Sequence, residues 1–208
     1  MVSSQIAALL LEVGAVKLNP QTPFKWASGW NSPIYCDNRL TLSFPDARSF
    51  IKNALAEIIL AKFPNVEAIA GVATAGVPQG ALVADLLNKP FVYVRPKPKD
   101  HGMTNLIEGK VEKGQKIVVI EDLISTGGSS IKAVEALRDA GVEVVGMAAI
   151  FTYGFKIADE NFAKANVKLV TLSNYFSLLE EGLRGRYITD DQVNSLKEWR
   201  EKPETWTT

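Results

Sequence analysis

The sequence predicts an α/β fold built on a parallel β-sheet with helices on both of its faces. Short apolar runs alternate with stretches of helical periodicity between about residues 45 and 172, which is the pattern of successive βαβ units. The runs KIVVI at 116–120 and VVGMAAI at 144–150 are almost continuously apolar. Strands that are buried on both faces of a sheet have this character.

The core is expected to begin with a helix over residues 45–62, because its apolar residues fall on one stripe at helical spacing. Ser43, Pro45 and Asp46 supply a start signal at its N-terminal end. The elements that follow alternate in type. In chain order they are a strand at 67–72, a helix from Gly76 to Asn88, strands at 91–95 and 116–122, a helix that ends at Gly141, a strand at 142–151, a polar helix near 156–165 and a strand at 167–172.

The residues outside this alternation are expected to form a small hood over the sheet. The stretch 22–39 has the pattern of short strands joined by turns, and residues 190–200 that of a helix. Thr189 and Gln192 have the spacing of a capping box at the start of this helix. A chain of 208 residues is of a size for one domain. We therefore expect a single domain over 1–208, with the hood at about 1–42 plus the C-terminal segment and the core at about 45–172.

Composition argues against several classes of function. The 23 basic side chains balance 23 acidic ones, so no global field draws the chain to nucleic acid or to an anionic membrane. No apolar stretch approaches the ~20 residues that span a bilayer. Cys36 is the only cysteine, which excludes an internal disulfide framework, and the N-terminus lacks the basic region of a signal peptide. We expect a cytoplasmic protein that binds neither nucleic acid nor membrane.

The most informative segment is KIVVIEDLISTGGSSIKAVEAL, which reads as a strand, a turn and a helix from residue 116 onward. Ligands bind at the carboxyl ends of parallel strands, and the N-terminus of a helix attracts anions. Gly127 and Gly128 let the backbone approach a phosphate closely. Hydroxyl groups that can add donors to this phosphate belong to Ser125, Thr126, Ser129 and Ser130.

Glu121 and Asp122 stand at the end of the predicted strand, where they would repel the same phosphate. Carboxylates are better matched to sugar hydroxyls, or to a Mg²⁺ ion reached through water. The segment therefore predicts one ligand that carries both a phosphate and hydroxyl groups. It has neither the lysine of a Walker A loop nor a GxGxxG pattern. The alternative is an ordinary turn in which Ser and Thr serve only as N-caps.

The residues from 96 to 109 combine polar, Pro and Gly residues with little periodic pattern, and they predict a long loop. Arg95, Lys97, Lys99 and His101 concentrate positive charge at its start. A solvated run of charge is one interpretation. The other is that the loop neutralises a leaving pyrophosphate and closes to exclude water from the reaction.

The run IVVIEDLISTGGSS resembles the phosphoribosyl-diphosphate (PRPP) motif of type I phosphoribosyltransferases. The resemblance implies the type I phosphoribosyltransferase fold, an α/β fold with a central parallel sheet flanked by helices and a small N-terminal hood. It implies that Glu121 and Asp122 bind the ribose hydroxyls of PRPP. It also implies that the 5-phosphate is bound by Leu123, Ile124, Ser125, Thr126, Gly127, Gly128 and Ser129.

GVATAGVPQG at 71–80 corresponds to the pyrophosphate-binding turn of that family. The resemblance implies that Thr74, Ala75 and Gly76 offer backbone N–H groups there. A plain connection between a strand and a helix is the alternative.

Two further segments resemble those of orotate phosphoribosyltransferases: the loop pattern RxKxKDHGxxNxIEG from Arg95, and SGWNSPIYCDNR in the hood. SLLEEGLRGRYI at 177–188 is similar as well. The resemblance implies transfer of ribose 5-phosphate from PRPP to N1 of orotate, which gives orotidine 5′-monophosphate and pyrophosphate in pyrimidine biosynthesis. It further implies Mg²⁺ held mainly by PRPP and water, without a direct protein ligand, and a homodimer that shares the loop 96–109 across subunits.

The same resemblance implies roles for individual residues. Arg95, Lys99 and His101 would contact the diphosphate of PRPP, the last two in the neighbouring subunit's site. Because the ribosyl centre becomes positively charged in the transition state, we expect Lys99, His101 and Asp122 to be catalytic. Lys99 and His101 would stabilise the departing pyrophosphate, and Asp122 would steady the ribose and the metal shell. No protein nucleophile is needed, and Cys36 is expected to be a packing residue.

The sequence departs from the family pattern at two places. Ala27 stands where some relatives carry a lysine that contacts PRPP. Lys25 is a hypothetical substitute, because in an extended segment it projects from the same face. TYGF at 152–155 stands where some relatives place an arginine against the orotate carboxylate. Orotate must then be held by other groups: first Ser125, then the backbone near Ile34 and Tyr35, and Arg39, which can equally be a structural ion-pair partner.

Two other functions remain open at this level. The chain could be a phosphoribosyltransferase for another base, such as xanthine or uracil, although the hood and loop patterns favour orotate. It could also be a PRPP-sensing regulator that binds RNA without catalysis. Zero net charge and an intact Lys99–Asp100–His101 run argue against the regulator.

Overall fold

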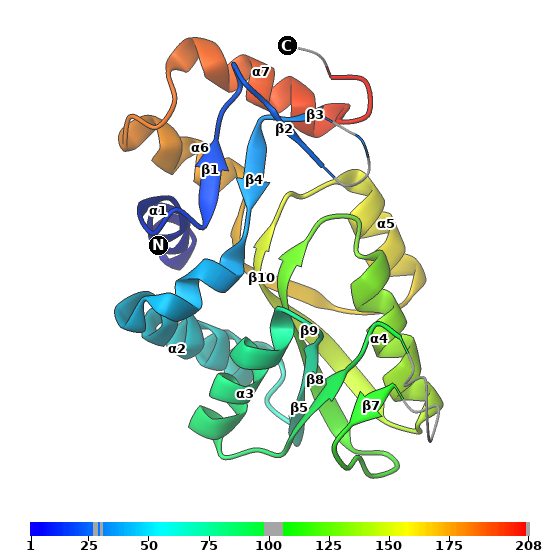
Figure 1. Cartoon of the computed structure of the whole chain (residues 1–208). Coiled ribbons are helices and arrows are strands. Elements are labelled where there is room, and N and C mark those ends of the chain that lie inside the picture. Colours follow the sequence, from blue (N-terminus) through cyan, green and yellow to red (C-terminus); the bar gives the residue numbers. More distant parts are fainter. Residues whose placement is uncertain (27–28, 30, 98–105, 207–208) are drawn as a thin grey trace.

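The computed structural model describes residues 1–26, 29, 31–97 and 106–206 (Figure 1). Its helices are α1 (Val2–Glu12), the 3₁₀ helix η1 (Asn38–Ser43), α2 (Pro45–Lys62), α3 (Gly76–Leu87), α4 (Gly128–Asp139), α5 (Lys156–Lys164), α6 (Tyr175–Arg184) and α7 (Asp190–Glu201). Its strands are β1 (Val16–Leu18), β2 (Phe24–Lys25), β3 (Asn31–Ser32), β4 (Ile34–Cys36), β5 (Ala68–Val72), β6 (Phe91–Val94), β7 (Ile107–Glu108), β8 (Lys116–Ile124), β9 (Glu143–Thr152) and β10 (Leu169–Asn174).

A six-stranded sheet forms the centre of the molecule, in the order β10-β9-β8-β5-β6-β7. Its first five strands pair in parallel, and only the edge strand β7 runs antiparallel to its neighbour. The predicted alternation of strands and helices is therefore confirmed. The long strands β8 and β9 are parallel neighbours inside the sheet, so the turns that follow them lie at the same edge.

Helices cover both faces of this sheet, with α2 and α3 on one side and α4 and α5 on the other (Figure 1). The apolar residues of strand β8 pack against the helices on both faces of the sheet. Val118 and Ile120 pack into the core under α2 and α3, whereas Ile117 and Val119 pack into the core under α4. Because alternate residues of a strand face opposite ways, a strand buried on both faces has to be apolar throughout.

Two boundaries differ from the sequence-based expectation. Strand β8 continues two residues past Asp122, because Leu123 and Ile124 still pair with Phe151 and Thr152 of β9. The two acids therefore lie within the strand and not at its end. The stretch expected to be an irregular loop contains β7, which pairs with Tyr93 and Val94 and so forms the antiparallel edge of the sheet.

The hood contains two small antiparallel pairs, β1 with β4 and β2 with β3. Strands β2, β3 and β4 lie within the stretch 22–39 that was expected to form short strands, whereas β1 precedes it and was not predicted. Helix α1 packs against α6 and β10, and neither α1 nor α6 was predicted. Helix α7 begins with the predicted capping box of Thr189 and Gln192. In the part of the chain described, no helix is both long and apolar enough to cross a bilayer.

Trp199 of α7 fixes the C-terminal segment to the rest of the hood. Its fully buried ring lies 5.5 to 5.8 Å from the rings of four other aromatic residues, namely Trp26, Tyr153, Phe155 and Tyr175. Its Nε1 donates to the carbonyl oxygen of Asn31 over 3.2 Å. The first and last parts of the sequence thus meet above the sheet (Figure 1).

Candidate active site

The turn between β8 and α4 takes its shape from Gly127. This residue has a φ of 81°, which residues with a Cβ rarely adopt, and a Cβ there would lie 2.7 Å from Cε2 of Phe162. Asn161 of α5 supports the turn by donating from Nδ2 to the carbonyl oxygen of Thr126 over 3.0 Å. Helix α4 begins at Gly128, so the N–H groups of its first turn face this segment. The arrangement suits a phosphate.

Glu121 is buried, with 6% of its surface exposed. Its Oε2 accepts a 3.0 Å hydrogen bond from the hydroxyl of Ser130, and its Oε1 accepts a 3.1 Å bond from the backbone N–H of Asp122. Ser130 is 1% exposed. The expectation that its hydroxyl donates to a phosphate is therefore wrong in this structure, because the first turn of α4 points that side chain inward to Glu121.

The two neighbouring acids are electrostatically linked. Burial and the charge of Asp122 raise the pKa of Glu121 to about 8. Burial also raises the pKa of Asp122, although a hydrogen bond from Glu121 opposes the rise. At neutral pH the pair therefore retains a proton on Glu121. Donors or a cation beside these groups would favour their ionised forms.

This retained proton predicts how stability depends on pH. An unfolded glutamate ionises near its ordinary pKa of 4.5, whereas folded Glu121 ionises at about 8. Between these values the native state binds more protons than the unfolded state, so the free energy of unfolding falls as pH rises. Glu121→Gln removes this contribution. We expect the ligand-free variant to gain stability relative to the wild type between about pH 5 and pH 8, as measured by urea unfolding. A difference that stays constant over this range would contradict the assignment.

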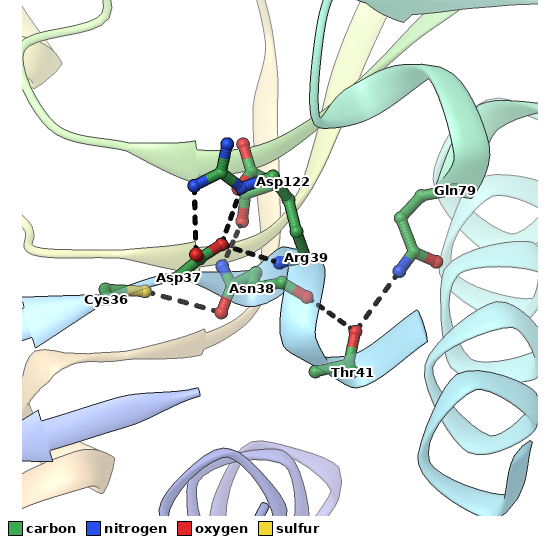
Figure 2. A network of polar contacts seen from close by, with 7 residues as sticks. All are labelled: Cys36, Asp37, Asn38, Arg39, Thr41, Gln79 and Asp122. Atoms are coloured by element: carbon green, nitrogen blue, oxygen red, sulfur yellow. Dashed lines mark hydrogen bonds and ion pairs between the residues drawn. The ribbon is translucent and has the colours of Figure 1, made fainter. Parts of the chain in front are cut away.

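Asn38 connects the hood to the acidic strand (Figure 2). Its Nδ2 donates to the carbonyl oxygen of Asp122 over 2.7 Å, and its Oδ1 accepts from the thiol of Cys36 over 3.3 Å. Its own carbonyl oxygen accepts a 2.6 Å bond from the hydroxyl of Thr41, which in turn lies 3.4 Å from Nε2 of Gln79 in α3. Strand β8, helix η1 and helix α3 are thereby held together beside the acids.

Cys36 and Arg39 belong to the same network (Figure 2). Burial, with the nearby carboxylates of Asp122 and Asp37, raises the pKa of the Cys36 thiol well above its usual range. A thiol that stays protonated is a poor nucleophile, in agreement with the predicted packing role. Arg39 binds Asp37 through Nε and Nη2 over 2.6 and 2.9 Å. Of the two roles considered for Arg39, the ion pair is the one that the structure contains.

A cavity of about 600 Å³ opens on one side of the turn, and we call it the loop cavity. Arg95, at the end of β6, lines it together with Gly128, Ser129 and Lys132 of α4. Nη1 of Arg95 lies 3.6 Å from a carboxylate oxygen of Glu108. The structure thus brings Arg95 to the predicted phosphate turn. It also adds Lys132, which the sequence analysis did not single out.

A second cavity of about 310 Å³ opens on the hood side of the same turn, and we call it the hood cavity. Its lining combines one lysine, one serine, three aromatic residues and two smaller ones: Lys25, Ser125, Trp26, Tyr35, Tyr153, Cys36 and Leu123. Tyr153 belongs to the TYGF segment. Nε and Nη2 of Arg200 in α7 donate to the carbonyl oxygens of Tyr153 and Gly154 over 3.2 and 2.8 Å, which fixes this wall.

The predicted pyrophosphate turn lies where β5 meets α3. Helix α3 begins at Gly76, directly after Thr74 and Ala75. A Cβ on Gly76 would overlap the backbone oxygen of Ile120 in β8, so only glycine allows the helix to start this close to the acidic strand.

Two of the predicted catalytic residues, Lys99 and His101, lie outside the described residues, as does Ala27.

The comparisons with known proteins agree with this geometry. Residues 46–180 match the family model of the phosphoribosyl transferase domain. The orotate phosphoribosyltransferase of Cytophaga hutchinsonii is 61% identical over 204 residues, which cover 98% of each chain. This chain belongs to the orotate phosphoribosyltransferase family. The family member of Porphyromonas gingivalis is also 61% identical, over 97% of this chain and 96% of that protein.

Solved structures of an orotate phosphoribosyltransferase and of a UMP synthase support the fold. The enzyme from Aeropyrum pernix superimposes with a TM-score of 0.76 at 34% identity, over 85% of this chain and 97% of that one. The UMP synthase of Leishmania donovani gives a TM-score of 0.80 at 26% identity, over 95% of this chain and 42% of that longer one. The type I phosphoribosyltransferase fold expected from the sequence is therefore confirmed.

The predicted run from Glu121 to Ser129 reaches both cavities. Ser125 lines the hood cavity, and Gly128 and Ser129 line the loop cavity. Asn38 was not predicted, because its role depends on a contact 84 positions away in the chain. No local pattern marks such a residue. Among the described residues, no group of three or more His, Cys, Asp or Glu side chains is arranged to hold a metal ion.

Proposed function

We propose that this enzyme transfers the 5-phosphoribosyl group of PRPP to N1 of orotate, giving orotidine 5′-monophosphate and pyrophosphate in pyrimidine biosynthesis. The observation that carries the proposal is that one turn lines two cavities. PRPP bound along Glu121–Ser129 would place its diphosphate toward the loop cavity and leave the hood cavity for the base. The family relationship supports this choice of substrates.

The residues of the PRPP motif divide between the parts of this substrate. The turn from Leu123 to Ser129 would bind the 5-phosphate through backbone N–H groups and hydroxyls. Glu121 and Asp122 would accept hydrogen bonds from the ribose hydroxyls. Asn38 supports Asp122 through its backbone oxygen. Arg95, which lines the loop cavity, would contact the diphosphate.

Mg²⁺ is the proposed cofactor, bound mainly through PRPP and water. The two adjacent carboxyl groups fit this requirement: burial raises the pKa of both, and a nearby cation would stabilise their ionised forms. When bound, the ion would neutralise part of the negative charge on the diphosphate. Glu121 and Asp122 would orient its water shell without binding it directly.

Catalysis in this proposal depends on positioning and on charge, and no protein nucleophile takes part. As the bond to pyrophosphate lengthens, the ribosyl carbon becomes positive and the leaving group negative. Lys99 and His101 would stabilise that negative charge, and Asp122 would steady the ribose. The raised pKa of Cys36 agrees with a mechanism that does not use the thiol.

We further propose a cytoplasmic homodimer in which the loop 96–109 is shared between subunits. The described ends of this loop are joined on the outer strands of the sheet, where the N–H of Arg95 donates to the carbonyl oxygen of Leu106 over 2.8 Å. A loop that starts at the edge of the sheet is well placed to reach a neighbouring copy. Lys99 and His101 would then complete the partner's site.

The proposed activity is tested by mixing the protein with orotate, PRPP and Mg²⁺ and following the loss of orotate absorbance. We expect turnover that ceases when a chelator removes Mg²⁺ and resumes when the ion is restored. Parallel reactions with uracil and xanthine test transfer to another base. Turnover of either base at the rate found for orotate would contradict the assigned specificity.

A further inference from the structure

The lining of the hood cavity suits a flat ring. Trp26, Tyr35 and Tyr153 supply aromatic walls, and Ser125 brings the PRPP turn to its edge. Trp26 and Tyr153 are themselves packed together with ring centroids 5.3 Å apart. Aromatic walls bind planar heterocycles of many kinds. They do not by themselves distinguish orotate from uracil, because the two differ by a carboxylate.

Among the described residues that line this cavity, Lys25 alone carries a positive charge. The nearby arginines are engaged elsewhere: Arg39 binds Asp37, and Arg200 donates to the backbone of Tyr153 and Gly154. Within the described part of the chain, Lys25 has no ion-pair partner. An ammonium group at the edge of an aromatic cavity is a suitable partner for a carboxylate.

The backbone of Lys25 is held in place by its neighbours. Lys25 pairs with Asn31 across β2 and β3, and the carbonyl oxygen of Asn31 accepts the 3.2 Å bond from Trp199. The next residue, Trp26, donates from Nε1 to the carbonyl oxygen of Ile34 over 3.1 Å. On the other side, the ring of Phe24 lies 5.7 Å from that of Tyr35. The lysine therefore extends from a fixed position on the cavity wall.

We propose that Nζ of Lys25 binds the carboxylate of orotate in the hood cavity and thereby selects orotate over pyrimidines that lack this group. The inference rests on the proposed function and adds a specificity residue to it. It assigns Lys25 to the base, whereas the sequence pattern suggested a contact with PRPP. It also accounts for recognition of the carboxylate where TYGF replaces the arginine of some relatives.

Lys25→Met tests this assignment, because it keeps a long apolar side chain and removes the charge. A charge-assisted hydrogen bond contributes enough to predict a KM for orotate about 10–100-fold higher, while the KM for PRPP stays within about twofold. Lys25→Arg should retain most of the affinity for orotate. Lys17→Met is the matched control, because Lys17 is an exposed lysine on hood strand β1 that does not line the cavity.

Equilibrium binding of nucleotides measures the contribution of the carboxylate without any reaction taking place. Orotidine 5′-monophosphate and uridine 5′-monophosphate differ only in that group, so Lys25→Met should weaken binding of the first by about 10–100-fold and leave the second unchanged. Equal losses for both nucleotides, or a raised KM for PRPP with an unchanged KM for orotate, would overturn the assignment. A wild type that binds both nucleotides but does not turn over orotate would instead refute the proposed function. Equal melting temperatures of variant and wild type exclude misfolding.

Discussion

Lys99→Ala is expected to lower kcat by about 10²–10³-fold while changing the dissociation constant of PRPP much less. The reason is that the cation meets full negative charge only as pyrophosphate departs, so its contribution belongs to the transition state. Steady-state kinetics give kcat, and calorimetric titration with PRPP gives the affinity. Lys97→Ala is the control, since Lys97 lies in the same basic segment but has no proposed catalytic role. A raised KM with an unchanged kcat would exclude a transition-state role for Lys99.

The same variant tests whether the loop is shared between subunits. Lys99→Ala and Asp122→Asn are each expected to be nearly inactive alone. If Lys99 serves the neighbouring site, a mixed dimer has one site with both defects and one site with neither. Unfolding and refolding an equal mixture should then restore about a quarter of the wild-type activity, because about half of the dimers are mixed. A mixture as inactive as its components would contradict sharing.

Gly127→Ala is expected to lower kcat/KM for PRPP by about 100-fold and to destabilise the fold by about 1–3 kcal/mol. The residue has a φ of 81°, and its new Cβ would lie 2.7 Å from the Phe162 ring. If the backbone moves to avoid the positive φ or the close contact with Phe162, the turn that is proposed to bind the 5-phosphate is displaced. Steady-state kinetics at varied PRPP and urea unfolding measure the two effects.

Gly128→Ala provides the matched control for this prediction. A Cβ on Gly128 would have only Oγ1 of Thr126 nearby, at 4.0 Å, and its φ is not in the left-handed region. It should leave the free energy of unfolding within about 1 kcal/mol of the wild type, because alanine is a good helix former. Equal stability losses in both variants would mean that the conformation of Gly127 is not the cause.

The sequence was most informative where a structural role depends on neighbouring residues. Strands β8 and β9 could be recognised because burial on both faces requires unbroken apolar runs. The candidate PRPP turn could be singled out because its glycines, hydroxyls and acids are close together in the sequence. The inward orientation of Ser130 could not be foreseen. It depends on the rotation at which α4 leaves the turn, which directs Ser130 to Glu121.

The candidate base site was predicted only in part, because it is assembled from distant segments. Ser125 was expected there. Tyr153 reaches it because β9 pairs with β8, whereas Lys25 meets it only through the folding of the hood. The bond from Asn38 to the backbone of Asp122 likewise joins segments 84 residues apart. Such pairings follow from tertiary packing, and neither periodicity nor local composition records them.

Trp199 and Arg200 lie far downstream of the predicted PRPP motif, and this order affects how the site is assembled during synthesis. The strand, turn and helix that are proposed to bind the phosphosugar leave the ribosome well before α7 does. The wall around Tyr153 gains its support from Arg200 only afterwards. A nascent chain can therefore fold the proposed phosphosugar half early, whereas the proposed pocket for the base is completed only after α7 has been made.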